Sequence, residues 1–487
     1  MIRSGAAVTN RDGRPGPPRR TTPGLVLAIC CTSLFLVTMD GSIVHVALPS
    51  IQRDLGGDLS ALQWVVDGYL MVMASLLVLA GSLADRFGRR RFFAVGLSLF
   101  AAASLLCGLA PSVGVLVAAR VLQGVGAAML NPVALAIIVS VYPDRSRRAR
   151  ALGWWSAVSG LGVAAGPPLG GLVVTLGGWR WVFLLTVPVA AVGVLLTLRH
   201  VPESRALLPR RPDPRGQLLL SGAVAGLIVT LIEAPHRGWT WPVLLALAVG
   251  AGSALLFVRH GLRHPVPLVD PRLFRSRRLV VAVGSAVGGF ACFGGTLFTV
   301  SLALQTGAGW DALAAGLMVL PLGVAALLTS PWVGALVARR RSRLCLGLAG
   351  ALMTAALLGL GVVLGDGTPA PEALLLAAVL ALFGIGLGML NPPVTATALA
   401  GLPPDRSGVA GALASTARQL GLAVGVAVAG SLIGAGPGAL VWLGLVPGAL
   451  LVLVLAVAVM PARQDQPQEA PATPRGRVRS STPCPRP

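Results

Sequence analysis

The sequence predicts an all-α integral membrane protein with 14 transmembrane helices. Of its 487 residues, 55% are hydrophobic and only 11% are charged, whereas a soluble domain carries about 25% charged residues. The apolar residues gather in runs long enough to cross a bilayer as single helices. A pair of short motifs also occurs twice in the chain, which indicates a duplicated structural unit.

Basic residues alternate between successive loops. The sequence contains no lysine, so all 39 basic residues behind the net charge of +22 are arginines. Of these, 34 lie in the terminal segments and in every second loop, and three, Arg53, Arg180 and Arg237, lie in the other loops. This asymmetry follows the positive-inside rule and predicts that both termini are cytoplasmic. Nucleic-acid binding, which a basic chain can also indicate, leaves the alternation unexplained, so we expect no nucleic-acid partner.

Fourteen apolar runs define the expected helices in chain order. The first six are 24–48, 61–82, 92–110, 113–141, 151–175 and 180–198. The next two are 216–234 and 240–258. The last six are 279–303, 311–337, 344–365, 371–399, 407–434 and 437–460. An even number of spans agrees with two termini on the same side of the membrane.

The repeated motifs lie at the end of the fourth span and at the end of the twelfth. Met-Leu-Asn-Pro begins at Met129 and again at Met389, and Pro-Asp-Arg-Ser follows each copy, at Pro143 and Pro404. When the seventh and eighth spans are set aside, the twelfth becomes the counterpart of the fourth in two six-helix halves. We therefore expect two pseudo-symmetric six-helix bundles plus two inserted helices, a plan used by secondary transporters with a site between the halves.

These boundaries divide the chain into five parts. The two ends of the chain are rich in proline and arginine and are expected to be disordered in the cytoplasm. The parts are an N-terminal tail (1–22), an N-terminal bundle (23–198), cytoplasmic linkers with the two inserted helices (199–278), a C-terminal bundle (279–460) and a C-terminal tail (461–487).

Three charged residues lie deep within spans of the first half: Asp40, Asp67 and Arg120. At 1.5 Å per helical residue, all three sit roughly 10–14 Å below the outer surface, where a charge is costly unless it is paired or hydrated. Arginine stays charged and can neutralise one carboxylate, so the other is left to titrate. We expect Asp40 or Asp67 to carry a coupling proton while Arg120 tunes it; a static ion pair that packs the helices is the alternative.

Other polar and aromatic side chains in the spans are candidates for a substrate cavity. They are His45, Gln123, Asn131, Trp154, Trp155, Asn391, Arg418 and Gln419. Arg418 lies about 16 Å from the cytoplasmic face, where it could bind substrate or order the second half. The histidine could relay protons or pack through a hydrogen bond, and the amides could line a cavity or bridge helices.

Two glycine-containing segments have a physical interpretation of their own. In the loop GSLADRFGRRR (81–91), Gly81 permits a close helix approach, and Asp85 could accept from an arginine of the loop or cap a neighbouring helix. In the span 151–175, Gly162, Gly166 and Gly170 recur every four residues and so share one face, which permits close backbone contact.

Taken together, these motifs resemble those of the major facilitator superfamily, in particular its fourteen-helix drug:proton antiporter branch. The resemblance covers nearly all of residues 24–460. Its motifs are MDGSIVHVALPSI (39–51), GSLADRFGRRR (81–91), RVLQGVGAA (120–128), GLGVAAGPPLGG (160–171), WRWVFLLTVP (179–188) and TARQLG (416–421). One departure is His45, where the branch usually has asparagine. Another is the span 311–337, which has no acidic residue beyond Asp311 at its edge, so dicationic drugs are not expected substrates.

The resemblance implies roles for two sets of residues. A gating loop would comprise Gly81, Asp85, Arg86, Gly88, Arg89 and Arg90, with Asp85 contacting the eleventh span (344–365) as a latch of the outward-facing state. An antiporter motif that seals the halves against proton leak would comprise Gly162, Gly166, Pro167, Gly170 and Gly171. Arginines that only set topology, and glycines that only pack helices, are the alternatives.

The implied function is proton-coupled export of hydrophobic drugs or antibiotics by alternating access. The protein would work as a monomer in the cell membrane, with lipid, protons and a small lipophilic substrate as partners and without a cofactor. The sequence has no P-loop and no HExxH motif, and its five histidines are scattered, so we expect neither an enzyme nor a metal site. The alternatives are a dedicated exporter of one endogenous metabolite, such as a self-made antibiotic, and a membrane scaffold or sensor.

Overall fold

The structure is a computed structural model that describes residues 22–205, 212–365, 372–402, 407–432 and 436–460. Within these ranges the secondary structure is helical, and 14 helices are long and apolar enough to cross a membrane. The predicted all-α class with 14 spans is confirmed. The two predicted tails lie almost entirely outside the described residues.

The first half is built from six spans, of which the last is made of two short helices. They are α1 (Pro23–Leu55), α2 (Leu59–Phe87), α3 (Arg89–Gly108), α4 (Val113–Val141), α5 (Arg145–Gly177) and α6 (Arg180–Leu184) continued by α7 (Thr186–His200). The break between α6 and α7 precedes Pro188, which lacks the N–H that would bond to the carbonyl of Leu184. Asp58 and Ser112 cap the starts of α2 and α4 with their side chains.

Two inserted helices and a second set of six spans follow. The inserted pair is α8 (Pro214–Arg237) and α9 (Trp241–Arg263), followed by the short 3-10 helix η1 (Pro271–Arg275). The second half comprises α10 (Arg277–Leu302) with the π-turn η2 (Ala303–Gly307), α11 (Ala312–Ala338), α12 (Ser342–Val363), α13 (Ala373–Ala400) and α14 (Ser407–Ser431). Its last span runs through α15 (Pro437–Leu440), η5 (Val441–Leu445), α16 (Val446–Val454) and η6 (Leu455–Val459).

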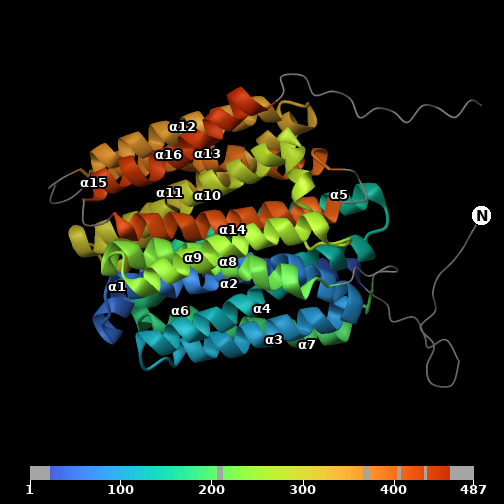
Figure 1. The fold of residues 1–487 in the computed structure, drawn as a ribbon. Coiled ribbons are helices and arrows are strands. Elements are labelled where there is room, and N and C mark those ends of the chain that lie inside the picture. Colours follow the sequence, from blue (N-terminus) through green and yellow to red (C-terminus); the bar gives the residue numbers. More distant parts are fainter. Residues whose placement is uncertain (1–21, 206–211, 366–371, 403–406, 433–435, 461–487) are drawn as a thin grey trace, which may run out of the picture.

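The helices lie side by side along one axis (Figure 1). Helices of the first half (blue to teal) form the lower part of the view, those of the second half (yellow to red) form the upper part, and α8 and α9 (green) lie over the junction. The halves meet along two seams, α2 against α14 and α5 against α11, and α8 packs on both helices of the first seam. The burial pattern of residues 131–140 is repeated residue by residue in 391–400, as a duplication predicts.

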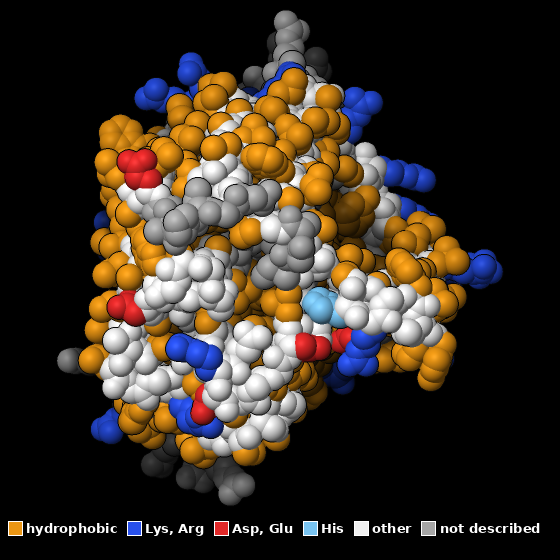
Figure 2. Space-filling model, turned by 90° about the vertical axis from the view of Figure 1, so that its left-hand side faces the viewer, with side chains coloured by type: hydrophobic (Ala, Val, Ile, Leu, Met, Phe, Trp, Pro, Cys, Tyr) orange, Lys and Arg blue, Asp and Glu red, His pale blue; other side chains and the backbone are white. Residues whose placement is uncertain are grey.

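The two ends of the bundle differ in charge. The basic end, as we call it, carries the arginine-rich segments 86–91, 145–150, 259–278 and 339–343. The opposite end carries the turns around 56–58, 109–112, 178–179 and 308–311. Figure 2 looks onto the opposite end and shows hydrophobic side chains covering the flanks. Exposed leucines and valines of α7, α9 and α12 contribute to these flanks, which are the surface expected to contact lipid.

Candidate functional site

A buried ion pair joins α1 to α4. Arg120 Nη1 lies 2.6 Å from Asp40 Oδ2, and the exposed fractions of the two side chains are 1% and 0%. Gln123, one helical turn from Arg120, donates its Nε2 to Asp40 Oδ1 (2.9 Å) and to Ser104 Oγ (2.9 Å) and accepts from Arg120. This network therefore holds side chains from α1, α3 and α4 together.

The guanidinium of Arg120 is further fixed from α2. Its Nε donates to the carbonyl of Val65 (2.9 Å), and its Cζ lies 4.2 Å from the centre of the Tyr69 ring. The ion pair, the hydrogen bond and the contact with an aromatic face together offset the cost of burying this cation. Arg120 and Asp40 thus satisfy each other and leave no unpaired charge in this network.

Asp67 stands apart from that network. Its side chain is fully buried, and neither carboxyl oxygen has a hydrogen-bond partner among the described residues. The three charged residues predicted from sequence therefore divide into a compensated pair and one carboxyl group without a partner.

The position of Asp67 on α2 places it at a seam between the halves. Gln63 donates its Nε2 across this seam to the carbonyls of Val426 (3.3 Å) and Ala427 (2.8 Å) of α14. Asp67 follows Gln63 by four residues, so both side chains lie on the same face of α2. Asp67 is therefore about one turn deeper in the seam, on the basic side of the Gln63 contact.

The glycine-rich segment of α5 uses two faces. On one face, Gly162, Gly166 and Gly170 lie so close to α1 that a Cβ atom at any of them would collide with an α1 side chain, that of Thr38, Ser42 or Ile43 respectively. On the other face, Gly171 meets Ala312 and Leu313 of α11, and Gly316 of α11 meets the Pro167 carbonyl. One face thus packs beside Asp40 within the first half, and the other closes the second seam.

Hydrogen bonds between the halves, among the described residues, lie toward the opposite end. Besides Gln63, Ser301 Oγ donates to the carbonyl of His45 (2.6 Å), and Gln305 Nε2 donates to that of Val46 (3.1 Å). Nearer the basic end, a Cβ atom at Gly153 of α5 or Gly411 of α14 would meet nothing within 4 Å. The halves are therefore fastened together at the opposite end.

The loop after α2 is held by ion pairs on its own side of the seam. Asp85 pairs with Arg89 (2.8 Å), and Arg89 also donates weakly to the carbonyl of Ala136 on α4 (3.4 Å). Arg90 and Arg91 each lie 3.8 Å from the carboxylate of Glu203. Sequence reasoning missed Glu203, although an acidic residue in an arginine-rich segment is a usable signal.

The predicted latch between Asp85 and the eleventh span does not fit the fold. That span is α12, which packs on α13 and α16 at the far side of the second half (Figure 1). The helix of the second half beside α2 is α14. Of the other loop residues, Gly81 faces Pro132 of α4 at ordinary contact distance, Gly88 adopts φ 109° next to Glu203, and Arg86 is exposed.

The residues proposed for a substrate cavity do not form one cluster. Gln123 belongs to the Asp40 network. His45 is buried with its ring edge-on to Phe298, and its Nδ1 has no hydrogen-bond partner among the described residues. Arg418 donates to Asn391 Oδ1 (3.2 Å). The others are the half-buried Asn131, Trp155 and Gln419 and the exposed Trp154.

A cluster with metal-binding chemistry lies at the basic end, where the sequence predicted no metal site. One ligand atom each from Asp213, His260 and His264 lies within 4.8 Å of the others. Asp213 caps α8 and accepts from the N–H groups of Gly216 (2.9 Å) and Leu268 (3.1 Å) and from His260 Nε2 (2.9 Å). Burial acts to raise the pKa of Asp213, but these hydrogen bonds outweigh it and lower the pKa. In this structure the cluster links α8, α9 and the loop that follows α9.

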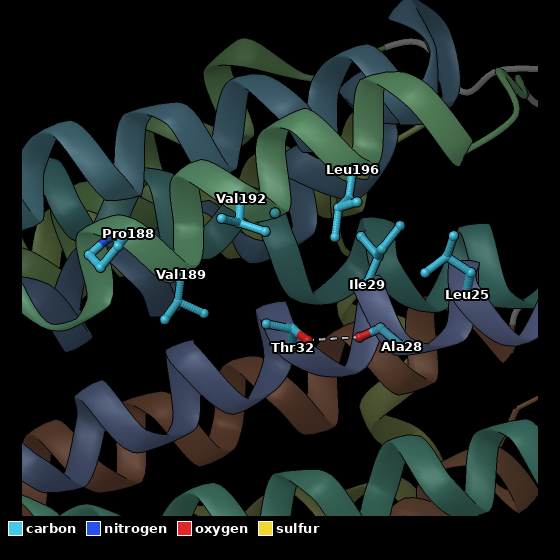
Figure 3. A pocket seen from close by; sticks show the side chains of 9 residues that line it. Leu25, Ala28, Ile29, Thr32, Pro188, Val189, Val192 and Leu196 are labelled. Carbon is cyan, nitrogen blue, oxygen red and sulfur yellow. Dashed lines mark hydrogen bonds between the residues drawn. The ribbon is translucent and has the colours of Figure 1, made fainter.

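An apolar pocket of about 370 Å³ lies between α1 and α7 (Figure 3). Leu25, Ile29 and Thr32 of α1 face Val192 and Leu196 of α7 across it. The Thr32 hydroxyl bonds to the carbonyl of Ala28 (2.9 Å), so it does not present a free donor to the pocket. The pocket is separate from the buried charges.

Two helical halves that meet along packed seams, with ionisable side chains buried at membrane depth, define a secondary transporter. It is a transporter rather than an enzyme. The chain belongs to the Major Facilitator Superfamily, whose profile matches residues 30–426.

Curated relatives are resistance and efflux proteins. The chain is 38% identical to multidrug resistance protein Stp of Mycobacterium tuberculosis, over 84% of this chain and 76% of that protein. It is 36% identical to the methylenomycin A resistance protein of Streptomyces coelicolor, over 88% and 89% of the two chains. Drug efflux pump JefA of M. tuberculosis is 38% identical to this chain, over 87% of this chain and 82% of that protein. These relatives are thus drug-resistance and drug-efflux members of the same superfamily.

A solved structure shares the fold. A POT family transporter in complex with 5-aminolevulinic acid superposes with a TM-score of 0.68 over 89% of this chain and 94% of that chain. The two sequences are 16% identical, so this likeness concerns the fold alone.

Proposed function

We propose that this chain exports lipophilic drugs or antibiotics in exchange for protons, and that Asp67 carries the coupling proton. The relatives' names support the substrate class. The observation that carries the proton assignment is the full burial of Asp67, without a hydrogen-bond partner among the described residues, on the α2 face that meets α14. A carboxylate without compensation is costly in such a place, so the group holds its proton while the seam is closed.

Proton movement would be coupled to opening of the seam. Charged Asp67 needs water, so deprotonation favours separation of α2 from α14, and protonation lets the helices close around a neutral group. Asp40 differs from Asp67, because Arg120 pairs with it and Gln123 donates a hydrogen bond to it. In alternating access, the proton taken up outside would stay on Asp67 during closure of the opposite end and leave toward the cytoplasm.

The orientation and setting complete the proposal. The basic end, with both termini, faces the cytoplasm by the positive-inside rule. The transporter works as a monomer in the cell membrane and needs no cofactor beyond the proton gradient. A relative named tetracenomycin C resistance and export protein, from Streptomyces glaucescens and 35% identical, supports a second candidate, export of a single self-made compound.

Proton flux in everted membrane vesicles tests the function. Vesicles with an acid lumen receive lipophilic compounds one at a time, and a pH-sensitive dye reports the lumen. We expect at least one compound to collapse the gradient in vesicles that contain the protein and to leave vesicles without it unchanged. A folded, abundant protein that moves protons with none of the compounds would contradict broad drug export and favour the dedicated exporter.

Closure of the α5–α11 seam gives a further prediction. Gly171→Val should let the vesicle pH gradient decay several-fold faster without any substrate, because the added side chain collides with the α11 backbone at Ala312 and Leu313. The matched control is Gly153→Val on the same helix, where a Cβ meets nothing within 4 Å. Equal decay rates in the two variants would remove the seam from the proton barrier.

A further inference from the structure

Arg418 is a cation in the middle of α14 that has no acidic partner in the described part of the chain. It lies eleven residues after Ser407 and thirteen before Ser431, which places it about 16 and 20 Å from the ends of the helix. In the part of the chain that the structure describes, its hydrogen bonds go to neutral oxygens of Asn391 (3.2 Å), Thr395 (3.3 Å) and Ser415 (3.0 Å). An arginine at membrane depth is normally paired, as Arg120 is here.

The described residues of the second half supply no carboxylate at that depth. Between 279 and 460 the acidic residues are Asp311, Asp366, Glu372 and Asp405. Asp311 and Glu372 stand at the starts of α11 and α13, and the other two fall between the described helices in sequence. Within the described residues, the charge of Arg418 therefore has no counter-ion from its own half.

The duplication argues against a purely structural role for this arginine. The equivalent position of the first half, 260 to 261 residues earlier, is Ala157 or Val158. The copy of Asn391 there is Asn131, whose Oδ1 has no hydrogen-bond partner in the described residues. The first half thus folds with the same Met-Leu-Asn-Pro segment and without an arginine to bridge to it.

The hydrogen bonds of Arg418 leave a pair of donors free. Its Nη1 donates to Asn391 and Thr395, and its Nη2 donates once to Ser415. Of five N–H groups, the Nε–H and one Nη2–H have no partner among the described residues. Two neighbouring donors on a planar guanidinium match the two oxygens of a carboxylate, and the half-buried side chain is accessible to one.

We propose that Arg418 binds an anionic group of the transported compound, so that the substrates include lipophilic carboxylic acids. This inference rests on the proposed export function and narrows its substrate class. Neutral neighbours hold the guanidinium in place without cancelling its charge, and the arriving acid supplies the missing counter-ion. A carboxylate would gain a bidentate charge-assisted contact that a neutral ester or amide of the same shape cannot make.

Binding to the purified full-length protein in detergent tests the inference separately from transport. The probes are aryl carboxylates, each paired with its neutral primary amide, and the readout is the ligand-induced rise in unfolding temperature. In wild type we expect each acid to bind at least tenfold more tightly than its amide. Arg418→Gln should abolish that preference, Arg418→Lys should keep part of it, and the surface variant Arg339→Gln should keep it in full.

The outcomes separate this inference from the proposed function. Wild type that binds acids no better than amides overturns the anionic site, as does an acid preference that survives Arg418→Gln. If Arg418→Gln does not fold, the Arg418→Lys variant provides the test. An undiminished preference for the acid over its amide in that variant overturns the bidentate contact. Acid binding that depends on Arg418 without any proton movement in vesicles would uphold the site and contradict proton-coupled export.

Discussion

Asp67→Asn should abolish substrate-induced proton flux, reducing it to the level of membranes that lack the protein. Asparagine has the shape of the neutral carboxylic acid, so the α2–α14 seam can still close around it, but it has no proton to release. Exchange of substrate down its own gradient should therefore survive while export against a gradient is lost. Both are measurable in one vesicle preparation, with the pH dye for protons and a labelled compound for substrate.

The matched control for Asp67→Asn lies on the same helix. Asp58 is the exposed cap of α2, and asparagine caps a helix about as well as aspartate, so Asp58→Asn should keep full proton flux. Asp40→Asn distinguishes the roles of the two buried carboxyl groups, because it removes the carboxylate that pairs with Arg120 and leaves Asp67 unchanged. Proton flux from Asp67→Asn within twofold of wild type would exclude Asp67 as the carrier.

Arg120→Gln should produce the largest loss of stability of any single substitution in the first half. It leaves the Asp40 carboxylate fully buried without its counter-ion, and breaking a buried pair in this way costs about 3–5 kcal/mol. The unfolding temperature of the detergent-solubilised protein measures the effect. Arg91→Gln, which removes an exposed arginine 3.8 Å from Glu203 and leaves Arg90 beside that carboxylate, should change it little, because exposed pairs contribute about 0–1 kcal/mol.

A double variant distinguishes an unpaired charge from lost packing. Asp40→Asn combined with Arg120→Gln leaves neutral amides that can hydrogen-bond to each other and to Gln123. If the buried charge is the cause, the double variant should be more stable than Arg120→Gln alone. If both lose the same stability, the cost comes instead from the contacts of Arg120 with Val65 and the Tyr69 ring.

The 14 spans could be predicted because a membrane restricts the backbone more than water does. A chain segment in hydrocarbon must satisfy its own hydrogen bonds, so an apolar run of sufficient length is a helix. The capping residues Asp58 and Asp144 start helices outside the hydrocarbon core, which is why α2 and α5 begin before their predicted first residues.

The candidate site was predicted only in part. Sequence supplied Asp40, Asp67 and Arg120 and their similar depth, but it could not say which carboxylate is paired. It left open whether Gln123 lines a cavity or bridges helices, and the structure shows a bridge from α4 to Asp40 of α1. It also chose the eleventh span as the partner of Asp85, because the order of helices around a bundle does not follow from their order in the chain.

The sequence by itself determined the number of spans, their duplication and the depth of each buried charge, because these quantities depend only on composition and on counting residues along a helix. Tertiary structure alone decided that Arg120 neutralises Asp40. It also decided, for the residues that the structure describes, that Asp67 lies at a seam without a hydrogen-bond partner and that Arg418 bonds to neutral oxygens only. The physical reason is that depth is set along a helix axis, whereas the partner of a side chain is set by the direction in which it leaves the helix and by the neighbour that packs there.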